Sequence, residues 1–411
     1  MHASEIVLRF ADAHLWLMHA ARCRVFCAAV TAAMCGHCLS LSRLSRGLRG
    51  HGTFKSAIKR VDRLIGNPRI ADEAKFVGGA LLGVLSRMST PLVIAVDWSS
   101  VNPGGTFVEL RAVVTRLGMG RGLTVYQQVY PQSKLGNVKA ERKLLKTLHA
   151  LVPAGTSVTV VTDAGFRGPW FTQVARLGWA WLGRVRRPGH VSRDGRTWLT
   201  TVECFGKATG QAIRWADCQL TRASKLPSDL VLVRRRVRGG KRYRCPGHGS
   251  TNAATRKAKV SAHEPWLLAH SPSLRELYRA DEIVALYARR MQIEENFRDT
   301  KSQLYGMGSE IGRSRSASRL HALLLIANLA AFLLWHIGQL AGAEGVHCRF
   351  KATTRKAREL SIVALALMLC ASHSAPDMAQ HRCPTYALSP TGDATMKTGE
   401  TSGAGLCPAA V

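Results

Sequence analysis

The spacing of apolar and polar residues changes character near residue 85 of this 411-residue chain. Before that point, SLSRLSRGLRG and SAIKRVDRLIGNPRI combine serine starts, helical apolar spacing and repeated arginine or lysine, which favours helices. From residue 91 the pattern changes to short apolar runs typical of strands, namely PLVIAVDWSS, TFVELRAVV and LTVYQQVYP. The glycine-rich turn at 118–122 joins two of these strands and opens no helix, so a nucleotide-binding loop is not indicated.

Helix and strand patterns then alternate. NVKAERKLLKTLHALVP predicts a helix that starts at Asn137, and SVTVVTDAGF (157–166) predicts a buried strand. A short helix and the strand WAWLGRVRR come next, and EPWLLAHSP (264–272) restores a strand before another helix. This order predicts a mixed α/β core that is interrupted once, by a mostly β insertion.

The pattern divides the chain into five regions. We predict a helical region over 1–85, the first part of the α/β core over 86–186 and the β-rich insertion over 187–265. The second part of the core covers 266–342, and a C-terminal region covers 343–411. Beyond about residue 371 the composition is rich in Pro, Gly, Ser and Thr with little periodicity, which predicts a disordered tail.

The apolar run LHALLLIANLAAFLLWHIG (320–338) is long enough to span a membrane. Polar residues interrupt it at His321, Asn328 and His336, and basic sequence surrounds it. A buried core helix is therefore favoured over a membrane span.

The charge balance is strongly positive, with 58 Lys and Arg against 26 Asp and Glu and a formal net charge of +32. These cations are spread along the chain, and a polyanion such as nucleic acid is the simplest partner. The densest run, RRRVRGGKRYR (234–244), predicts a cationic loop within the insertion. The alternatives are a merely basic, ribosome-like protein and, for the run itself, a solvated loop.

The chain has 11 cysteines with irregular spacing, and Glu5 and Asp12 interrupt any signal-peptide pattern. Reduced thiols in a bacterial cytoplasm, close to the nucleoid, are the simplest expectation. A zinc site is an alternative for the cluster at 23, 27, 35 and 38, which includes a CxxC pair. Because the cluster lies in an Ala-rich helical stretch, packed free thiols are favoured.

Three carboxylates stand out as candidate chemistry. Asp97 and Asp163 each follow an apolar strand, and Glu294 lies in the helical segment LYARRMQIEENFRDTK (286–301). If that segment is one helix turning about 100° per residue, a tyrosine, an arginine and a lysine share a sector of about 60° with this glutamate. These residues are Tyr287, Arg290 and Lys301. Glu295 falls about 80° to the other side and is expected to form ion pairs.

Simpler interpretations exist for each part. Either aspartate alone could form a turn, and the helix could be an amphipathic helix with ion pairs such as Arg290 with Glu294. Together, however, they suit phosphodiester cleavage. Two Mg²⁺ ions about 3.5–4 Å apart can activate water and stabilise the leaving oxyanion, and Mg²⁺ prefers carboxylate ligands. Neighbouring cations, with Arg298 among them, would contact phosphate.

The motifs VDWSS, TDAGFRGPWF and Tyr287-x2-Arg290-x3-Glu294-x6-Lys301 closely resemble those of the DDE transposases of the IS-four family of bacterial insertion sequences. IKRVDRLIGN, EPWLLA and RMQIEENFRDTKS are also similar to that family, in particular to the group of the Tn-ten element. The resemblance runs from about residue 20 to about residue 340.

The resemblance implies an RNase H-like core, split by a β insertion, and a helical domain that binds element ends. It implies a triad that binds two Mg²⁺ ions, which Mn²⁺ can replace, formed by Asp97, Asp163 and Glu294. Supporting residues would be Tyr287, Arg290 and Lys301. The implied activity is cut-and-paste transposition by nicking, hairpin formation, hairpin opening and strand transfer, in a homodimer that bridges two DNA ends.

The resemblance also implies a tryptophan of the insertion that stacks on a flipped base, for which Trp198 and Trp215 are candidates. Both could instead be core residues of the insertion. Two other functions compete with an active transposase. One is an RNase H-like nuclease without strand transfer, and the other is an inactive derivative that only binds element ends. The tail after residue 371 departs from the helical C-terminus of the relatives.

Overall fold

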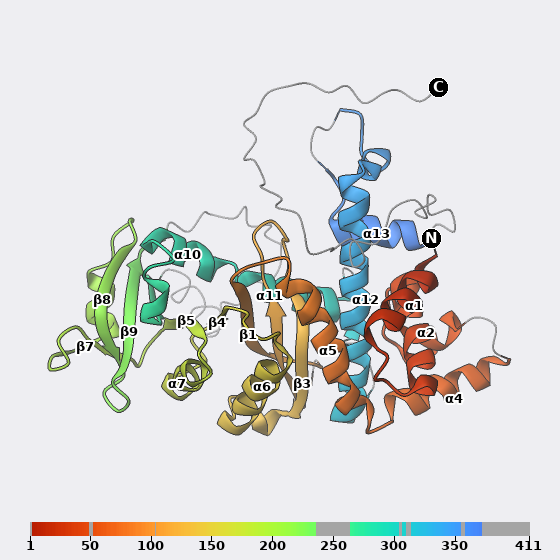
Figure 1. Cartoon of the computed structure of the whole chain (residues 1–411), viewed down its shortest axis with the longest axis horizontal. Coiled ribbons are helices and arrows are strands. Elements are labelled where there is room, and N and C mark those ends of the chain that lie inside the picture. The colour runs from red at the N-terminus through yellow and green to blue at the C-terminus, as the bar shows by residue number, and fades with distance from the viewer. Residues whose placement is uncertain are drawn as a thin grey trace, which may run out of the picture. The chain divides into compact units, whose positions relative to one another are not determined.

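A mixed β-sheet forms the centre of the chain (Figure 1). The computed structural model describes residues 2–48, 52–102, 104–235, 264–303, 306–309, 314–354 and 358–371. Within these residues the sheet has ten strands in the order β3-β2-β1-β4-β5-β10-β9-β8-β6-β7. Residues 372–411, which include the predicted disordered tail, lie outside the described residues.

The first five strands form the predicted RNase H-like core. They are β1 (Leu92–Ser100), β2 (Phe107–Val114), β3 (Leu123–Pro131), β4 (Val158–Thr162) and β5 (Ala180–Val185). β2 pairs antiparallel with both β1 and β3, whereas β4 runs parallel to β1 and β5 runs parallel to β4. The strand order 3-2-1-4-5 confirms the fold class that the sequence predicted.

Two helices lie in the connections that lead to the parallel strands β4 and β5. α6 (Val138–Leu151) begins where predicted, because the Asn137 side chain accepts hydrogen bonds from the backbone N–H groups of Lys139 and Ala140. α7 (Gly168–Arg176) leads from β4 into β5. The buried side chains of α6 and α7 share one core cluster with Leu92, Ile94 and Val96 of β1. These two helices therefore cover one face of the sheet.

The insertion continues the same sheet. It contains β6 (His190–Ser192), β7 (Trp198–Thr200), α8 (Thr201–Gly206), β8 (Ile213–Leu220) and β9 (Leu226–Val233). β9 pairs with β10 (Trp266–His270), and β10 pairs with β5. The prediction of a mostly β insertion is confirmed, and its strands extend the core sheet. Residues 236–263, with most of the cationic run at 234–244, lie outside the described residues.

The N-terminal region is helical, as predicted, and the buried helix α12 (Ala317–Ala343) connects it to the sheet. Its helices are α1 (Ala3–His14), α2 (Ala20–Gly36), α3 (Leu41–Gly47), α4 (Phe54–Ile65) and α5 (Ile70–Ser86). α12 packs against α2, β3 and the C-terminal helix α13 (Ile362–Ala371). Length and composition would let α12 cross a membrane, but 89% of its most apolar window is buried in the protein. It is the core helix that the sequence favoured.

The N-terminal cysteines pack as thiols. The Cys23 and Cys27 sulfurs lie 3.9 Å apart on α2, Cys38 is buried and Cys35 is exposed. Across the described ranges no group of three or more His, Cys, Asp or Glu side chains is arranged to hold a metal ion. The preference for packed free thiols over zinc at this cluster stays a prediction.

The segment 286–301 is not the single helix that the sequence predicted. It forms α10 (Ala280–Ala288) and α11 (Met291–Lys301), with a break at Arg289 and Arg290. At the break, the N–H of Arg290 bonds to the carbonyl of Tyr287, and the N–H of Ile293 bonds to that of Arg290. These three-residue bonds tighten the turn, so the even rotation of 100° per residue does not hold across it.

A buried arginine holds α11 against the sheet. Arg111 of β2 is fully buried beside the fully buried Glu109, and its Nε donates to the Glu109 carboxylate at 3.0 Å. Its Nη1 donates to Asn296 Oδ1 at 2.6 Å and to Thr300 Oγ1 at 3.1 Å, both on α11. The guanidinium also lies over the Phe297 ring, 4.8 Å from its centroid.

The turn between β2 and β3 holds the other side of α11. The Asn296 amide donates to the carbonyl of Gly122 at 2.9 Å, and the Gly122 N–H donates to the carbonyl of Gln292 at 2.9 Å. Arg121 pairs with Asp299 at 2.6 Å. Any side chain at Gly122 would approach Val113 to 2.5 Å, so the glycine permits this close contact. These contacts set the position of α11 on the sheet.

We expect Arg111→Met to destabilise the protein by about 3–5 kcal/mol, because it leaves the Glu109 carboxylate buried without its partner. Adding Glu109→Leu should recover at least half of that loss. Arg9→Met, at the exposed Arg9–Glu5 pair of α1, serves as a control and should cost at most about 1 kcal/mol. Urea unfolding measures all four proteins. A double variant as unstable as Arg111→Met would contradict the explanation.

Candidate active site

Strand register brings the two predicted aspartates together. β1 and β4 run parallel, with Val96 opposite Thr162. The next residue in each case is an aspartate, so Asp97 and Asp163 lie side by side. Asp97 shares its face of β1 with Val93 and Ala95 because side chains alternate along a strand. Those two residues pack in clusters with side chains of α10 and α11. Asp163 directly follows β4, as predicted, but Asp97 does not end its strand, because β1 continues to Ser100 in pairing with β2. Asp97 lies where the parallel pairing of β1 with β4 stops, on the face that these helices cover.

Arg290 joins Asp97 to Glu294. Its Nη1 donates to Asp97 Oδ2 at 2.9 Å and lies 3.4 Å from Glu294 Oε1. The arginine and Asp97 side chains are each 13% exposed, whereas Glu294 is 46% exposed. Asp163 is partly buried, and its carboxylate accepts a hydrogen bond from the N–H of Gly165 at 2.8 Å. The partly buried guanidinium thus bridges Asp97 and Glu294 and feels the charge of Asp163. The cluster opens to solvent on the side of Glu294.

Tyr287 and Lys301 also face β1, although the helix is broken. Tyr287 is buried on α10 with its ring edge-on to Trp266 at 4.9 Å, and burial raises the pKa of its phenol. The Lys301 ammonium donates to the hydroxyl of Ser99, which shares the face of Asp97 two residues along the strand. The structure therefore brings all four side chains of the spaced motif to one side of β1.

The electrostatics of the cluster are unbalanced. Burial, and then the charge of Asp163, raise the pKa of Asp97, Arg290 lowers it and Glu294 raises it, to a final value of about 7. In this partly buried site, the positive charge of one arginine does not offset the negative charges of three carboxylates. An added cation would relieve the repulsion, because each carboxylate gains attraction to it.

The donor set suits a hard divalent cation, because two aspartates and a glutamate offer the oxygen ligands that such ions prefer. The Arg290 guanidinium contacts Asp97 Oδ2 and Glu294 Oε1, the carboxylates that such an ion would bind. The donor types therefore suit a metal centre, but in the present arrangement the three carboxylates, like every other such group among the described residues, are not gathered closely enough to hold an ion. Arg290 contributes the positive charge instead.

Two other predicted residues lie at the edge of the site. Arg298 is exposed and pairs with Glu295 on the outer side of α11, so Glu295 forms the expected ion pair. A phosphate contact by Arg298 stays a prediction. Trp98 faces the opposite side of β1 from Asp97, where it packs against Tyr130 and donates from Nε1 to the Glu141 carboxylate of α6 at 3.1 Å.

The two tryptophans of the insertion differ in access. Trp215 on β8 is buried, with Arg193 and Lys207 over its ring at 5.3 and 5.7 Å. Trp198 on β7 is partly exposed, and β7 is the last strand of the sheet. Stacking of a base on either ring stays a prediction, and Trp198 is the more accessible of the two.

Sequence reasoning missed the residues that position α11. Glu109 and Arg111 are two apart in an apolar strand, so both point to one face of the sheet, and that pattern indicates a buried ion pair. Ser99, which accepts from Lys301, also lies on the face of Asp97. Asn296 carried no comparable signal, because its role depends on contact with Arg111, 185 residues away.

Comparison with known proteins identifies the family. A model of the transposase DDE domain matches residues 89–333, more than half of the chain and the range that holds all three carboxylates. The chain therefore belongs to the DDE transposase family, whose members generally act on DNA with divalent metal ions. No curated protein matches. Among solved structures, a cryo-EM structure of the piggyBac transposase synaptic complex with hairpin DNA is similar at 12% identity and a TM-score of 0.34, over 85% of this chain and 78% of that one.

Asp97→Asn should stabilise the metal-free protein above about pH 7 and change little near pH 4. The pKa of Asp97 is raised from 3.8 to about 7, so folding disfavours the ionised form, and stability falls as the pH rises between these values. At about 1.36 kcal/mol per pKa unit, the gain is at most about 4 kcal/mol. Urea unfolding in chelator at both pH values measures it. An equal effect at the two values would contradict the charge argument.

Proposed function

We propose that this protein is the DNA transposase of an insertion sequence and catalyses cut-and-paste transposition. One observation carries the proposal. In a chain of the DDE family, Asp97 within β1 and Asp163 directly after the parallel strand β4 lie on neighbouring strands, and Arg290 joins Asp97 to Glu294 on a helix. The three carboxylates lie far apart in sequence, and their assembly on one side of β1 suits metal-assisted chemistry on phosphodiesters.

The proposed metal ligands are Asp97, Asp163 and Glu294, with Mg²⁺ as the ion. When bound, two such ions activate the attacking oxygen and stabilise the leaving oxygen. Arg290 would exchange its contact with Asp97 for a phosphate oxygen, for which its planar guanidinium is suited. Tyr287 interacts with the Arg290 side chain, and Lys301 supplies a second cation on the same side of β1.

The reaction sequence is a series of displacements at phosphorus. Water attacks at the element end and the 3′ oxygen leaves. The freed 3′ hydroxyl then attacks the opposite strand to form a hairpin, water opens that hairpin, and the 3′ hydroxyl attacks target DNA. Each step exchanges one oxygen for another on phosphorus, so one site can serve all four in turn.

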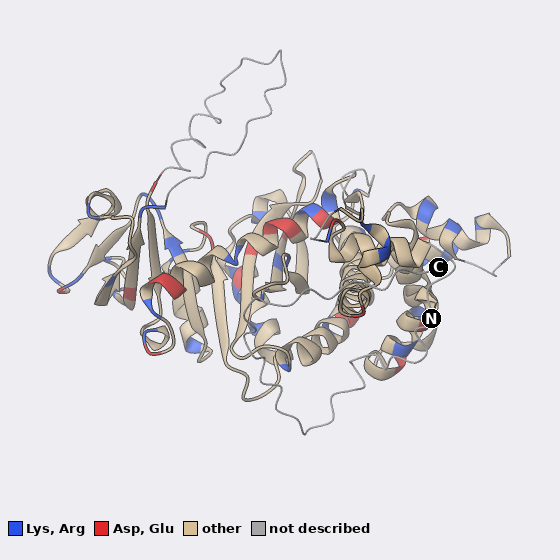
Figure 2. Cartoon of the chain, turned by 90° about the horizontal axis from the view of Figure 1, so that it is seen from above, with Lys and Arg blue, Asp and Glu red and all other residues tan. Residues whose placement is uncertain are grey.

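The proposed partners are the terminal inverted repeats of the element, the target DNA and a second copy of the chain. The helical region 1–85 would bind the element end, and the Lys and Arg positions spread over the described elements favour a polyanion (Figure 2). Trp198 would stack on a flipped base near the hairpin. The resemblance to the IS-four family supports these assignments, and we place the protein in the bacterial cytoplasm.

Metal-dependent cleavage tests the function directly. The purified protein, incubated with a duplex that carries the flanked element end, should nick it in Mg²⁺ and then form a hairpin, whereas chelator should block both steps. Denaturing gels with one labelled strand separate the products. Nicking without a hairpin or strand transfer would indicate a nuclease. Binding without cleavage would indicate an inactive protein that only binds element ends.

Glu294→Gln should reduce cleavage by more than about 100-fold, because the residue is proposed to bind the metal directly. Altering a residue that only orients a metal ligand typically costs about 10- to 100-fold. Glu295→Gln, its neighbour on the outer side of α11, is the matched control and should keep measurable cleavage. Both variants should bind the element end like the unaltered protein, as measured by fluorescence anisotropy. Equal loss of cleavage in the two would remove Glu294 from the proposed triad.

A further inference from the structure

The outer face of α6 carries a row of cations that the proposed active site does not use. Lys139, Arg142, Lys143 and Lys146 are all exposed, and their spacing of three, four and seven residues places them on one side of the helix. The inner side is apolar, with Leu144, Leu145 and Leu148 fully buried.

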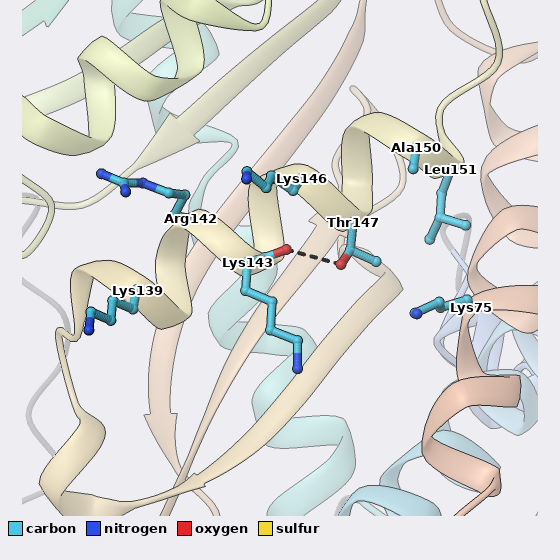
Figure 3. Close-up of a pocket in the computed structure, with 8 residues that line it drawn as sticks. All are labelled: Lys75, Lys139, Arg142, Lys143, Lys146, Thr147, Ala150 and Leu151. Carbon is cyan, nitrogen blue, oxygen red and sulfur yellow. Dashed lines mark hydrogen bonds between the residues drawn. The ribbon is translucent and has the colours of Figure 1, made fainter.

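The row lines a hollow together with a cation from another helix. Lys75 of α5 faces the row across a cavity of about 400 Å³ (Figure 3). Among the residues that the structure describes, no acidic side chain lines this cavity. We call the surface formed by the four cations of α6 and Lys75 the α6 groove.

Ion pairing within the protein does not account for these charges. Across the described ranges, none of the ion pairs involves a residue of the α6 groove. The acid of α6, Glu141, is buried on the other side and bonds to Trp98. Like charges three or four residues apart destabilise a helix by about 0.2–0.5 kcal/mol per pair. A polyanion would remove this repulsion.

The groove lies near both parts of the chain that are predicted to contact DNA, the carboxylate site and the N-terminal helical region. The start of α6 lies near Asp97 but on the opposite face of β1, because Glu141 accepts a hydrogen bond from Trp98, the next residue of the strand. The other side of the groove is α5, which belongs to the N-terminal helical region. Since α6 and α11 pack on opposite faces of β1, the groove cannot hold the reacting phosphate. It can hold a different stretch of the same duplex.

We propose that the α6 groove binds the phosphate backbone of the donor duplex, away from the cleaved bond. The proposal rests on the proposed function, because it requires DNA as the substrate, but it does not require cleavage. Lys139 and Lys146 are about 10 Å apart along the helix axis, a length over which B-DNA carries about six phosphate charges. Contacts of this kind add affinity and orientation without reading sequence.

The test compares two charge-matched double variants. Arg142→Gln with Lys146→Gln removes two cations of the α6 groove, and Arg222→Gln with Arg349→Gln removes two exposed cations away from it. Binding to the flanked element-end duplex is measured by anisotropy over a range of salt concentrations. If each groove cation contacts one phosphate, the slope of log K against log salt should weaken by about 1.8 in the first variant. The second variant should keep the slope of the unaltered protein.

A rescue variant separates charge from structure. Arg142→Lys with Lys146→Arg keeps both cations and should keep the salt slope, while thermal unfolding confirms that every variant is folded. Equal salt slopes for the two neutralised variants would overturn the proposal. It would also be overturned if the groove variant lost strand transfer into a target plasmid while its salt slope for the element-end duplex stayed unchanged. If the unaltered protein binds no DNA, the proposed function fails too. If it binds and cleaves DNA but the groove variant shows no change, only this inference fails.

Discussion

The buried Arg111 guanidinium is the interaction on which the geometry of the site depends. A fully buried arginine requires both a counter-charge and hydrogen-bond acceptors, since leaving either unmet costs several kcal/mol. Glu109 supplies the charge from the same strand, and Asn296 and Thr300 supply acceptors from α11. The requirement for acceptors therefore holds α11 at one place on β2. Glu294, two residues before Asn296, is brought near Asp97 of β1 as a consequence.

The cluster above that anchor is held together by opposing charges. Asp97, Asp163 and Glu294 repel one another, and Arg290 offsets part of this repulsion by contacting two of them. Such a site is destabilised in the absence of a further cation and would gain from binding one, which is the physical condition for a metal-dependent enzyme. The charge of the whole chain has the opposite sign, +32, and that excess would draw a polyanionic substrate toward an acidic site that would otherwise repel it.

A single sheet connects the insertion, the acidic cluster and the α6 groove. Because β9 pairs with β10 and β10 with β5, the insertion is an extension of the core sheet. The two faces then separate roles. One face of β1 carries Asp97 and Ser99 toward α10 and α11, and the other carries Trp98 toward α6. The alternation of side chains along one strand thus places the acidic cluster and the α6 groove on opposite sides.

The sequence by itself determined the features that depend on local pattern. Alternation and apolar runs located β1 to β5, the Asn137 cap located the start of α6, and the motif around Glu294 indicated the DDE transposase family and the candidate carboxylates. Only the tertiary structure decided features that depend on distant contacts. These are the helix break at Arg290, the joining of the insertion to β5 through β10, the burial of Trp215 and the Arg111 anchor. Periodicity reports which face of an element is apolar, but it does not say which partner that face meets, because partners are chosen by packing among residues far apart in the chain.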